Sequence, residues 1–338
     1  MAKTLAVIYR PTTFKDVVEQ DNIKAILLEQ LKSDDVKNAY LFCGSAGTGK
    51  TTCARIFANE INGGKGKPIE IDAASNSGVD NVREIGSGAY TKSISSEYKV
   101  YIIDECHSIS NTGWQAFLKL IEEPPAKTIF IFCTTNPEKI PKTILSRVQR
   151  YDFQRISNKG IVGRLKTILK AEKVKGAEDD ALRYIAKLAE GGMRDAISLV
   201  DKCLAYNKTL TLENVVDALG VVNYDTMKDL TECIVAGNTA IMIRMIEDLH
   251  GDGKDLKQFI KMYVQYLLDL CKYGVGCDWD DIQIPKTKAN KAMMKEVLSD
   301  YTTLIRLLKA TVELNSELKW STTAKYDIES KYVLFMEV

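Results

Sequence analysis

The sequence predicts an α/β domain with a parallel sheet, followed by regions that are entirely helical. In the first half of the chain, short apolar runs alternate with helical stretches, which is typical of a parallel sheet covered by helices. After about Ile156 the apolar residues recur at helical spacing instead. The length of 338 residues, with 45% hydrophobic and 27% charged residues, allows two or three domains with separate cores.

Four apolar runs in the first half predict the strands of the sheet. They cover residues 39–43, 68–72, 100–104 and 129–134. Several of these runs end directly at polar motifs, and open α/β sheets bind their ligands at the carboxyl ends of the strands. We therefore expect the functional site at that edge of the sheet.

The helical part of the chain divides into two predicted domains. In the first, a helix that ends at the glycine pair 191–192 is followed by a second helix beginning near Met193. In the second, apolar stripes at three- and four-residue spacing are interrupted at residues 274–288. The stripes contain Leu256, Phe259, Ile260, Tyr263, Leu267 and Leu270, then Leu304, Leu307, Leu308, Thr311 and Leu314. The predicted domains are 1–155 for the α/β domain, 156–221 for the small helical domain and 222–338 for the all-α domain.

Composition excludes several classes of protein. The net charge of +1 gives no general polycation, so any contact with nucleic acid needs a local patch. Neither a secretion signal nor a long apolar segment is present, which predicts a cytoplasmic protein without a membrane partner. The eight cysteines are scattered without a CxxC pair, so their spacing predicts neither zinc nor a disulfide framework.

A complete Walker A motif, GSAGTGKT, begins at Gly44. It follows the apolar strand YLFC and precedes the helical segment TTCARIFANEI, which is the context this motif requires. Its glycines let backbone N–H groups surround phosphate oxygens, Lys50 reaches the β- and γ-phosphates, and the Thr51 hydroxyl binds Mg²⁺. The residues predicted to bind ATP here are Gly44, Ser45, Ala46, Gly47, Thr48, Gly49, Lys50, Thr51 and Thr52.

An acidic pair stands at the end of the strand KVYIID. Asp104 is suited to hold Mg²⁺ through water, and Glu105 to orient or deprotonate the attacking water. A surface acidic pair is usually only solvated, but the apolar strand directly before this one argues for function. His107 has no partner histidine nearby for a metal site, and we interpret it as a structural residue at the strand exit.

Six segments in order resemble the bacterial DNA polymerase III gamma/tau clamp-loader ATPases. They are YRPTTFKDVVEQ, the Walker A loop, EIDAASNSGVDNVRE, DECHSISNTGWQAFLKLIEEPP, TTNPEKIPKTILSRVQRYDF and EGGMRDAISLVDK. The resemblance continues into the third domain with IVAGNTAIMIRMIEDL and KDLKQFI. It implies a RecA-like AAA+ domain, a helical lid and an oligomerising collar, in a gamma-like short form that hydrolyses ATP within a DNA polymerase holoenzyme.

The resemblance also implies roles for single residues. Thr135 corresponds to sensor 1, Arg194 to sensor 2, and Arg147 to an arginine finger acting in trans on ATP bound by a neighbouring subunit. The segment placed near the adenine is Tyr9, Arg10 and Pro11. An arginine aimed at the γ-phosphate stabilises developing charge and contributes roughly 10³- to 10⁵-fold in rate.

The chain departs from the family pattern at three places. Only residues 63–67 stand where the family carries a four-cysteine zinc insertion, so zinc is not predicted. Val148 replaces the cysteine of the family's SRC triplet beside Arg147. The chain ends at Val338, so we expect no extension of the tau type for binding polymerase and helicase.

The resemblance implies a sliding clamp, delta-like and delta-prime-like subunits, other copies of the chain and primer-template DNA as partners. Asn76, Ser77 and Arg83 are the candidate DNA contacts, although charged residues on an exposed helix are more often only solvated. Two other functions compete with the clamp-loader motor. One is another AAA+ DNA-processing ATPase, and the other is an architectural clamp-loader subunit with weak ATPase activity.

Overall fold

The computed structural model describes residues 4–75, 78–91, 93, 96–219, 224–282, 284 and 288–337. The chain falls into two compact units. The first consists of Met1–Lys173 and Ile185–Asp201, and the second of Val174–Tyr184 and Lys202–Val338. Division into domains 1–155, 156–221 and 222–338 stays a prediction.

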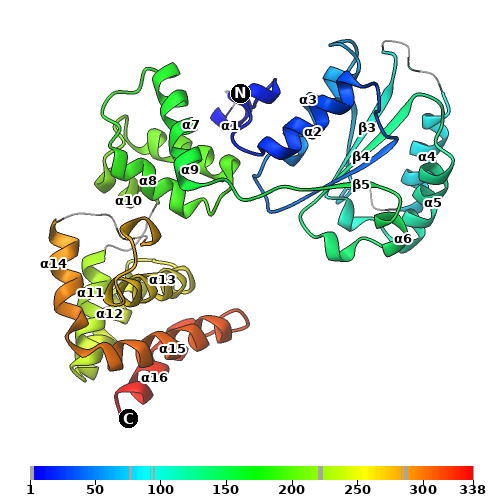
Figure 1. The fold of residues 1–338 in the computed structure, drawn as a ribbon. Helices are drawn as coiled ribbons and strands as arrows, with labels where there is room; N and C mark the ends of the chain where they lie inside the picture. Colours follow the sequence, from blue (N-terminus) through cyan, green and yellow to red (C-terminus); the bar gives the residue numbers. More distant parts are fainter. Residues whose placement is uncertain are drawn as a thin grey trace. The chain divides into compact units, whose positions relative to one another are not determined.

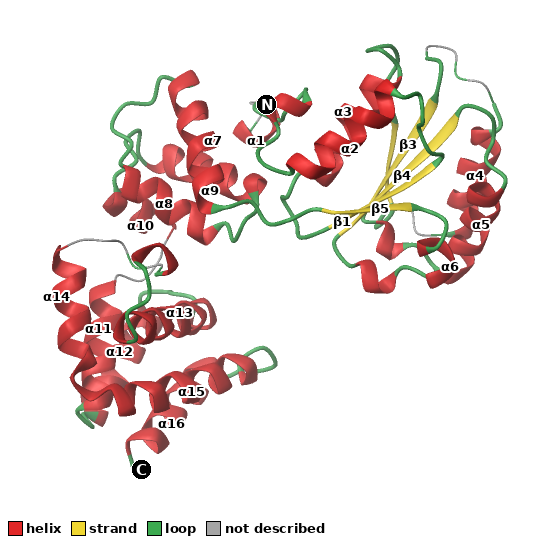
Figure 2. Ribbon diagram, in the orientation of Figure 1, coloured by secondary structure: helices red, strands yellow, loops and turns green. Residues whose placement is uncertain are grey.

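A five-stranded parallel sheet forms the centre of the first unit (Figures 1 and 2). Its strand order is β2-β3-β4-β1-β5. The strands are β1 (Ala39–Cys43), β2 (Ile69–Asp72), β3 (Lys99–Asp104), β4 (Thr128–Thr134) and β5 (Gln149–Asp152). This confirms the predicted α/β fold class and the four predicted strands, to which the structure adds β5 at the sheet edge.

Helices cover both faces of this sheet (Figure 1). The α-helices of the first unit are α1 (Leu5–Ile8), α2 (Asp21–Lys32), α3 (Lys50–Ile61), α4 (Val79–Ala89), α5 (Asn111–Glu122), α6 (Lys142–Leu145) and α7 (Asn158–Ala171). Tyr40 and Phe42 of β1 pack on the side of α2 and α3, whereas Leu41 and Cys43 pack on the side of α4 and α5. Strand β1 is therefore buried on both faces, as its uninterrupted apolar sequence requires.

Two further helices, α8 (Asp179–Leu188) and α9 (Met193–Tyr206), contribute residues to both units. Short 3₁₀ turns occur at Phe14–Asp16, Cys106–Ser108, Pro137–Lys139, Trp279–Asp281 and Leu298–Asp300. The glycine pair at 191–192 separates α8 from α9, which confirms the predicted helix end there.

The regular elements of the second unit are helices in its described residues, apart from an isolated β-bridge between Ala177 and Leu210 (Figure 2). Its helices are α10 (Leu212–Leu219), α11 (Tyr224–Val235), α12 (Thr239–Gly251), α13 (Leu256–Gly274), α14 (Lys288–Val297), α15 (Tyr301–Glu317) and α16 (Ala324–Met336). The predicted apolar stripes form its core, because their residues on α13 and α15 are buried except for the partly buried Leu308. None of the helices in the described part of the chain has both the length and the apolar composition needed to cross a bilayer.

Candidate nucleotide-binding site

The Walker A residues form a tight loop between the end of β1 and the start of α3. Gly44 has a φ of 145°, and a Cβ built on it would lie 2.5 Å from the Phe153 carbonyl oxygen. Gly47 has a φ of 71°, and its Cβ would lie 2.8 Å from the Gly192 Cα. Both positions therefore require glycine. Helix α3 begins at Lys50, so its N-terminus faces the loop and can bind an anion.

Lys50 is the buried cation of this loop, with only 6% of its surface exposed. Its Nζ donates hydrogen bonds of 2.8 Å to the carbonyl oxygens of Gly44 and of Ser45. Burial lowers the pKa of Lys50, and the nearby carboxylates of Glu105 and Asp104 oppose that shift. An ammonium group desolvated in this way gains strongly from an anionic ligand.

The acidic pair at the end of β3 lies beside the loop. The Thr51 hydroxyl donates to Asp104 Oδ2 at 2.8 Å, which brings together the two oxygen ligands predicted for Mg²⁺. Thr135 Oγ1 donates to Glu105 Oε2 at 3.0 Å, so the residue that the family resemblance places as sensor 1 directly contacts the residue predicted to orient the attacking water. Glu105 itself has a left-handed backbone conformation, with φ 48°.

His107 also contacts this carboxylate. Its Nδ1 lies 3.3 Å from Glu105 Oε2 and 3.2 Å from the Thr134 hydroxyl. Thr134 in turn accepts a hydrogen bond from the backbone N–H of Asn136. The carboxylate of Glu105 is therefore contacted by two side chains, of which the sequence analysis had assigned only Thr135 to the site.

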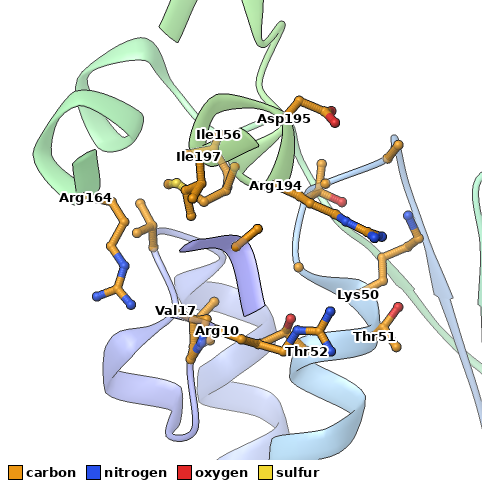
Figure 3. Close-up of a pocket in the computed structure, with 18 of the residues that line it drawn as sticks. Arg10, Val17, Lys50, Thr51, Thr52, Ile156, Arg164, Arg194, Asp195 and Ile197 are labelled. Carbon is orange, nitrogen blue, oxygen red and sulfur yellow. The ribbon is translucent and has the colours of Figure 1, made fainter. Parts of the chain in front are cut away.

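A pocket of about 300 Å³ joins these groups to the N-terminal segment and to the helices α7 and α9 (Figure 3). One end is polar and contains Lys50, Thr51, Asp104 and Glu105. The remaining lining residues are Ala6, Tyr9, Arg10, Pro11, Asp16, Val17, Val18, Ala46, Gly47, Thr48, Gly49, Thr52, Ile156, Arg164, Met193, Arg194, Asp195 and Ile197. A cavity of this size, with the phosphate loop and acidic pair at one end and a wall of apolar and charged side chains around the rest, suits a nucleotide.

Most of the predicted site residues meet in this pocket. Those that line it are Tyr9, Arg10, Pro11, Ala46, Gly47, Thr48, Gly49, Lys50, Thr51, Thr52, Asp104, Glu105 and Arg194. Gly44 and Ser45 contribute the carbonyl groups that hold Lys50, and Thr135 reaches the site through Glu105. The backbone N–H of Met193 donates to the Gly47 carbonyl at 3.0 Å, so the start of α9 is bonded directly to the phosphate loop.

Arg147 lies outside the residues that line the pocket, at the end of α6. Its Nε lies 2.7 Å from Glu122 Oε1, and one terminal nitrogen donates to the Thr143 carbonyl and to the Ser146 hydroxyl. With 40% of its side chain exposed, the guanidinium is anchored within its own chain yet accessible from outside. The role of Arg147 as an arginine finger stays a prediction.

Of the candidate DNA contacts, Asn76 and Ser77 lie outside the described residues, and Arg83 is exposed on α4. These contacts stay a prediction. Within the described residues, no group of three or more His, Cys, Asp or Glu residues is arranged to hold a metal ion.

The sequence did not identify Arg164 or the apolar residues Ile156 and Ile197 as part of the site. Arg164 lies in a lysine-rich helix, where a basic residue is indistinguishable by spacing from a solvated one. The buried residues of α7 include Ile161, Leu165 and Ile168, which recur at the three- and four-residue spacing of an amphipathic helix.

Two family models match the chain. Residues 69–157 match the model described as DNA polymerase III, delta subunit, and residues 160–209 match the DNA polymerase III clamp loader subunit, ATPase lid domain. Among solved structures, the Thermotoga maritima RuvB Holliday junction branch migration motor is similar, with a TM-score of 0.54 and 20% identity. That alignment covers 67% of this chain and 79% of RuvB, and it supports the AAA+ fold alone.

Relatives in several bacteria align over most of this chain. DNA polymerase III subunit tau of Bacillus subtilis (strain 168) is 35% identical over 339 residues, which cover 93% of this chain and 60% of the relative. DNA polymerase III subunit gamma/tau of Mycoplasma genitalium is 32% identical, over 79% of this chain and 48% of the relative. The chain thus spans about half to three-fifths of the length of these relatives. With the phosphate loop, the acidic pair and the lid helices arranged as described, the chain belongs to the family of DNA polymerase III gamma/tau subunits.

Proposed function

We propose that the protein is the ATPase motor subunit of a DNA sliding-clamp loader. It uses ATP binding and hydrolysis to open a clamp and to load it onto primer-template DNA during replication. The observation that carries the proposal is the pocket in which the phosphate loop, Asp104, Glu105 and Arg194 of the lid helix α9 converge. Names of the relatives and of the lid model support the same conclusion.

The polar end of the pocket binds the triphosphate. Lys50 exchanges its two carbonyl partners for phosphate oxygens, and the N-terminus of α3 contributes its dipole. Thr51 and Asp104 would hold Mg²⁺, the latter through water, and the ion would neutralise charge on the phosphates. These oxygen atoms fit the preference of Mg²⁺ for hard ligands.

Glu105 is the residue that orients the attacking water and accepts its proton. Thr135 and His107 fix the carboxylate from the side, so little reorganisation precedes the reaction. Arg194 reaches the phosphates of its own site from α9. Arg147 supplies the positive charge for the site of the neighbouring subunit, which makes hydrolysis depend on assembly.

The partners that follow from this function are the sliding clamp, delta-like and delta-prime-like subunits, further copies of the chain, and primer-template DNA. We infer that the α/β domain, the lid and the collar occupy residues 1–155, 156–221 and 222–338. The place of action is the cytoplasm, where the chromosome is copied.

Steady-state ATPase activity tests the proposal. The purified chain is assayed alone and with its delta-like subunits, the cognate clamp and primed DNA, next to Lys50→Ala and Arg147→Ala. Stimulation by clamp and DNA is expected, and both substitutions should abolish it while Arg147→Ala still binds ATP. Activity that does not respond to clamp and DNA would point to a different AAA+ machine. Absence of any ATPase activity would point to an architectural subunit.

A further inference from the structure

The N-terminal strap, residues 4–11, has little core of its own. It contains the four-residue helix α1, which is too short to be stable by itself. Leu5 is its buried residue, whereas Val7 and Ile8 are about half exposed. The position of the strap therefore depends on the residues that it contacts elsewhere in the first unit.

Those contacts go to the helices of the lid region. Arg164 of α7 donates a hydrogen bond of 2.9 Å to the Tyr9 carbonyl, and the Tyr9 hydroxyl donates one of 2.6 Å to Glu172 at the C-terminal end of α7. The backbone N–H of Leu5 donates to Asp201 of α9 at 3.2 Å. Tyr9 is thus held by α7 at both its backbone and its side chain. Each of these bonds involves a charged group, which makes them stronger than neutral hydrogen bonds.

The same strap forms one wall of the pocket. Ala6, Tyr9, Arg10 and Pro11 line the pocket, and so does Arg164, which binds the Tyr9 carbonyl. Figure 3 shows Arg164 and Lys50 on opposite sides of the pocket, with Arg10 between them. The triphosphate binds at the Lys50 side, so the strap side is left for the nucleoside.

We propose that Arg164 and Glu172 are positioning residues that hold the N-terminal strap as the nucleoside-binding wall, so that α7 controls nucleotide affinity without touching the phosphates. This rests on the proposed nucleotide site. When the bonds to Tyr9 are present, the wall is already in place before the nucleotide arrives, and the entropy of ordering residues 4–11 is not lost on binding.

A comparison of two ligands tests the inference. ADP carries the nucleoside, whereas inorganic tripolyphosphate occupies only the phosphate loop. We expect Arg164→Ala to raise the Kd for ADP about tenfold, the size expected for loss of one charged hydrogen bond. Affinity for tripolyphosphate, measured by its effect on the melting temperature, should stay unchanged. Turnover at saturating ATP should also stay near the wild-type value while KM rises.

Two conservative substitutions and a matched control complete the experiment. Tyr9→Phe keeps the ring and removes the bond to Glu172, and Glu172→Gln keeps an acceptor there. Their effects on the Kd for ADP should be non-additive if the pair acts as one contact. Lys170→Ala removes a positive charge from the same helix at an exposed position that does not line the pocket, and should leave the Kd for ADP unchanged.

The possible outcomes separate this inference from the proposed function. If the wild-type chain binds neither ADP nor ATP, the proposed function fails. If the wild-type chain binds ADP and both Arg164→Ala and Tyr9→Phe bind it equally well, the strap inference fails. An equal loss of affinity for ADP and for tripolyphosphate would also overturn it, because the defect would then lie in the whole site.

Discussion

The carboxylate of Glu105 is the centre of a small hydrogen-bond network. It accepts from Thr135 and lies within 3.3 Å of His107, which in turn contacts the Thr134 hydroxyl. A general base must keep one orientation relative to the attacking water, and two lateral partners supply that restraint. The role proposed for Glu105 is therefore separable from nucleotide binding, which we propose depends on Lys50.

Glu105→Gln should retain ATP binding and lose hydrolysis. Glutamine keeps the oxygen that accepts from Thr135 but has no capacity to accept a proton, so we expect turnover to fall at least about 10²-fold. Calorimetry of ATP binding and a phosphate-release assay measure the two effects. Glu123→Gln, in an exposed residue at the end of α5, is the matched control. A variant that still hydrolyses ATP at the wild-type rate would exclude Glu105 as the base.

The lowered pKa of Lys50 predicts an alkaline limit to ATP binding. Phosphate oxygens favour the charged amine, so binding raises the pKa of Lys50 again and requires a proton. Affinity for ATP should therefore fall as the pH rises through the lowered pKa, before the ordinary lysine value of 10.5 is reached. Burial raises the pKa of the Cys43 thiol to about 11 and raises that of Cys133 well above its usual value, so neither thiol ionises in the same interval.

The lowered pKa of Lys50 also predicts how its contribution to the free energy of unfolding changes with pH. Over that interval the unfolded chain keeps the proton on Lys50 while the folded chain loses it, so the contribution of Lys50 to stability increases with pH. Melting curves of the wild-type protein and of Lys50→Met, both without nucleotide, isolate this contribution as a difference. A difference that does not change with pH would contradict the prediction, as would an ATP affinity that stays constant up to pH 10.5.

Residues within contiguous motifs were predictable from the sequence, whereas residues brought together by tertiary structure were not. Lys50 and Thr51 follow the loop glycines directly, and Asp104 ends a strand, so local pattern fixes their positions. Arg164 contacts Tyr9 across 155 positions of sequence. No spacing rule connects two such residues.

At the level of elements, the N-terminus of α7 is fixed by hydrogen bonds to the segment before α2. Its N-cap Ser157 accepts from the Gly160 N–H and donates to Glu19, and Gln20 binds the backbone of Gln154 through both its amide atoms. A Cβ on Gly160 would lie 2.5 Å from Glu19 Oε1. The start of α7 is therefore attached to the segment that precedes α2.

Two glycines of α7 give opposite predictions for the same substitution. Gly163→Ala adds a Cβ in open space and should stabilise the protein by about 0.5–1 kcal/mol through helix propensity. Gly160→Ala should destabilise it by about 1 kcal/mol, because the methyl group displaces Glu19 from Ser157. Thermal unfolding of both variants measures the difference. Equal melting temperatures for the two variants would show that the contact with Glu19 does not restrain α7.

Strand β5 shows where element prediction from sequence fails. Its four residues, QRYD, are mostly polar, and Tyr151 is the one buried residue among them. An edge strand pairs on one side only, so it needs neither an apolar run nor strict alternation. Strands β1 and β4 are buried over their whole length, and their continuous apolar sequences made them predictable.

At the scale of the whole molecule, the order of motifs specified the fold class. A phosphate loop after the first strand and an acidic pair after a later one fit a parallel sheet with both motifs at its carboxyl edge. The structure confirms the parallel sheet, and both motifs line one pocket. Domain limits are harder to derive from sequence, because helical periodicity runs through residues 156–219 and resumes after residue 223 without a change in composition. The limits of the compact units therefore need not coincide with the predicted domain limits.

In the proposed assembly, each nucleotide site combines Lys50 of one subunit with Arg147 of its neighbour. Lys50→Ala lacks the ammonium group for ATP but keeps the proposed finger, whereas Arg147→Ala should bind ATP and lacks the proposed finger. In a head-to-tail arrangement, an interface between the two variants in the right order contains one intact site. A mixture in equal amounts should therefore recover ATPase activity at about a quarter of its interfaces if subunits combine at random.

The measurement is clamp- and DNA-stimulated ATPase activity of the mixture against each variant alone. A mixture of Lys50→Ala with the double variant Lys50→Ala/Arg147→Ala is the control, because no interface in it contains a competent nucleotide site. Recovery only in the first mixture would show that the finger crosses between chains. If Arg147→Ala alone were fully active, the ion pair with Glu122 would be the whole role of Arg147, and hydrolysis would need no neighbouring subunit.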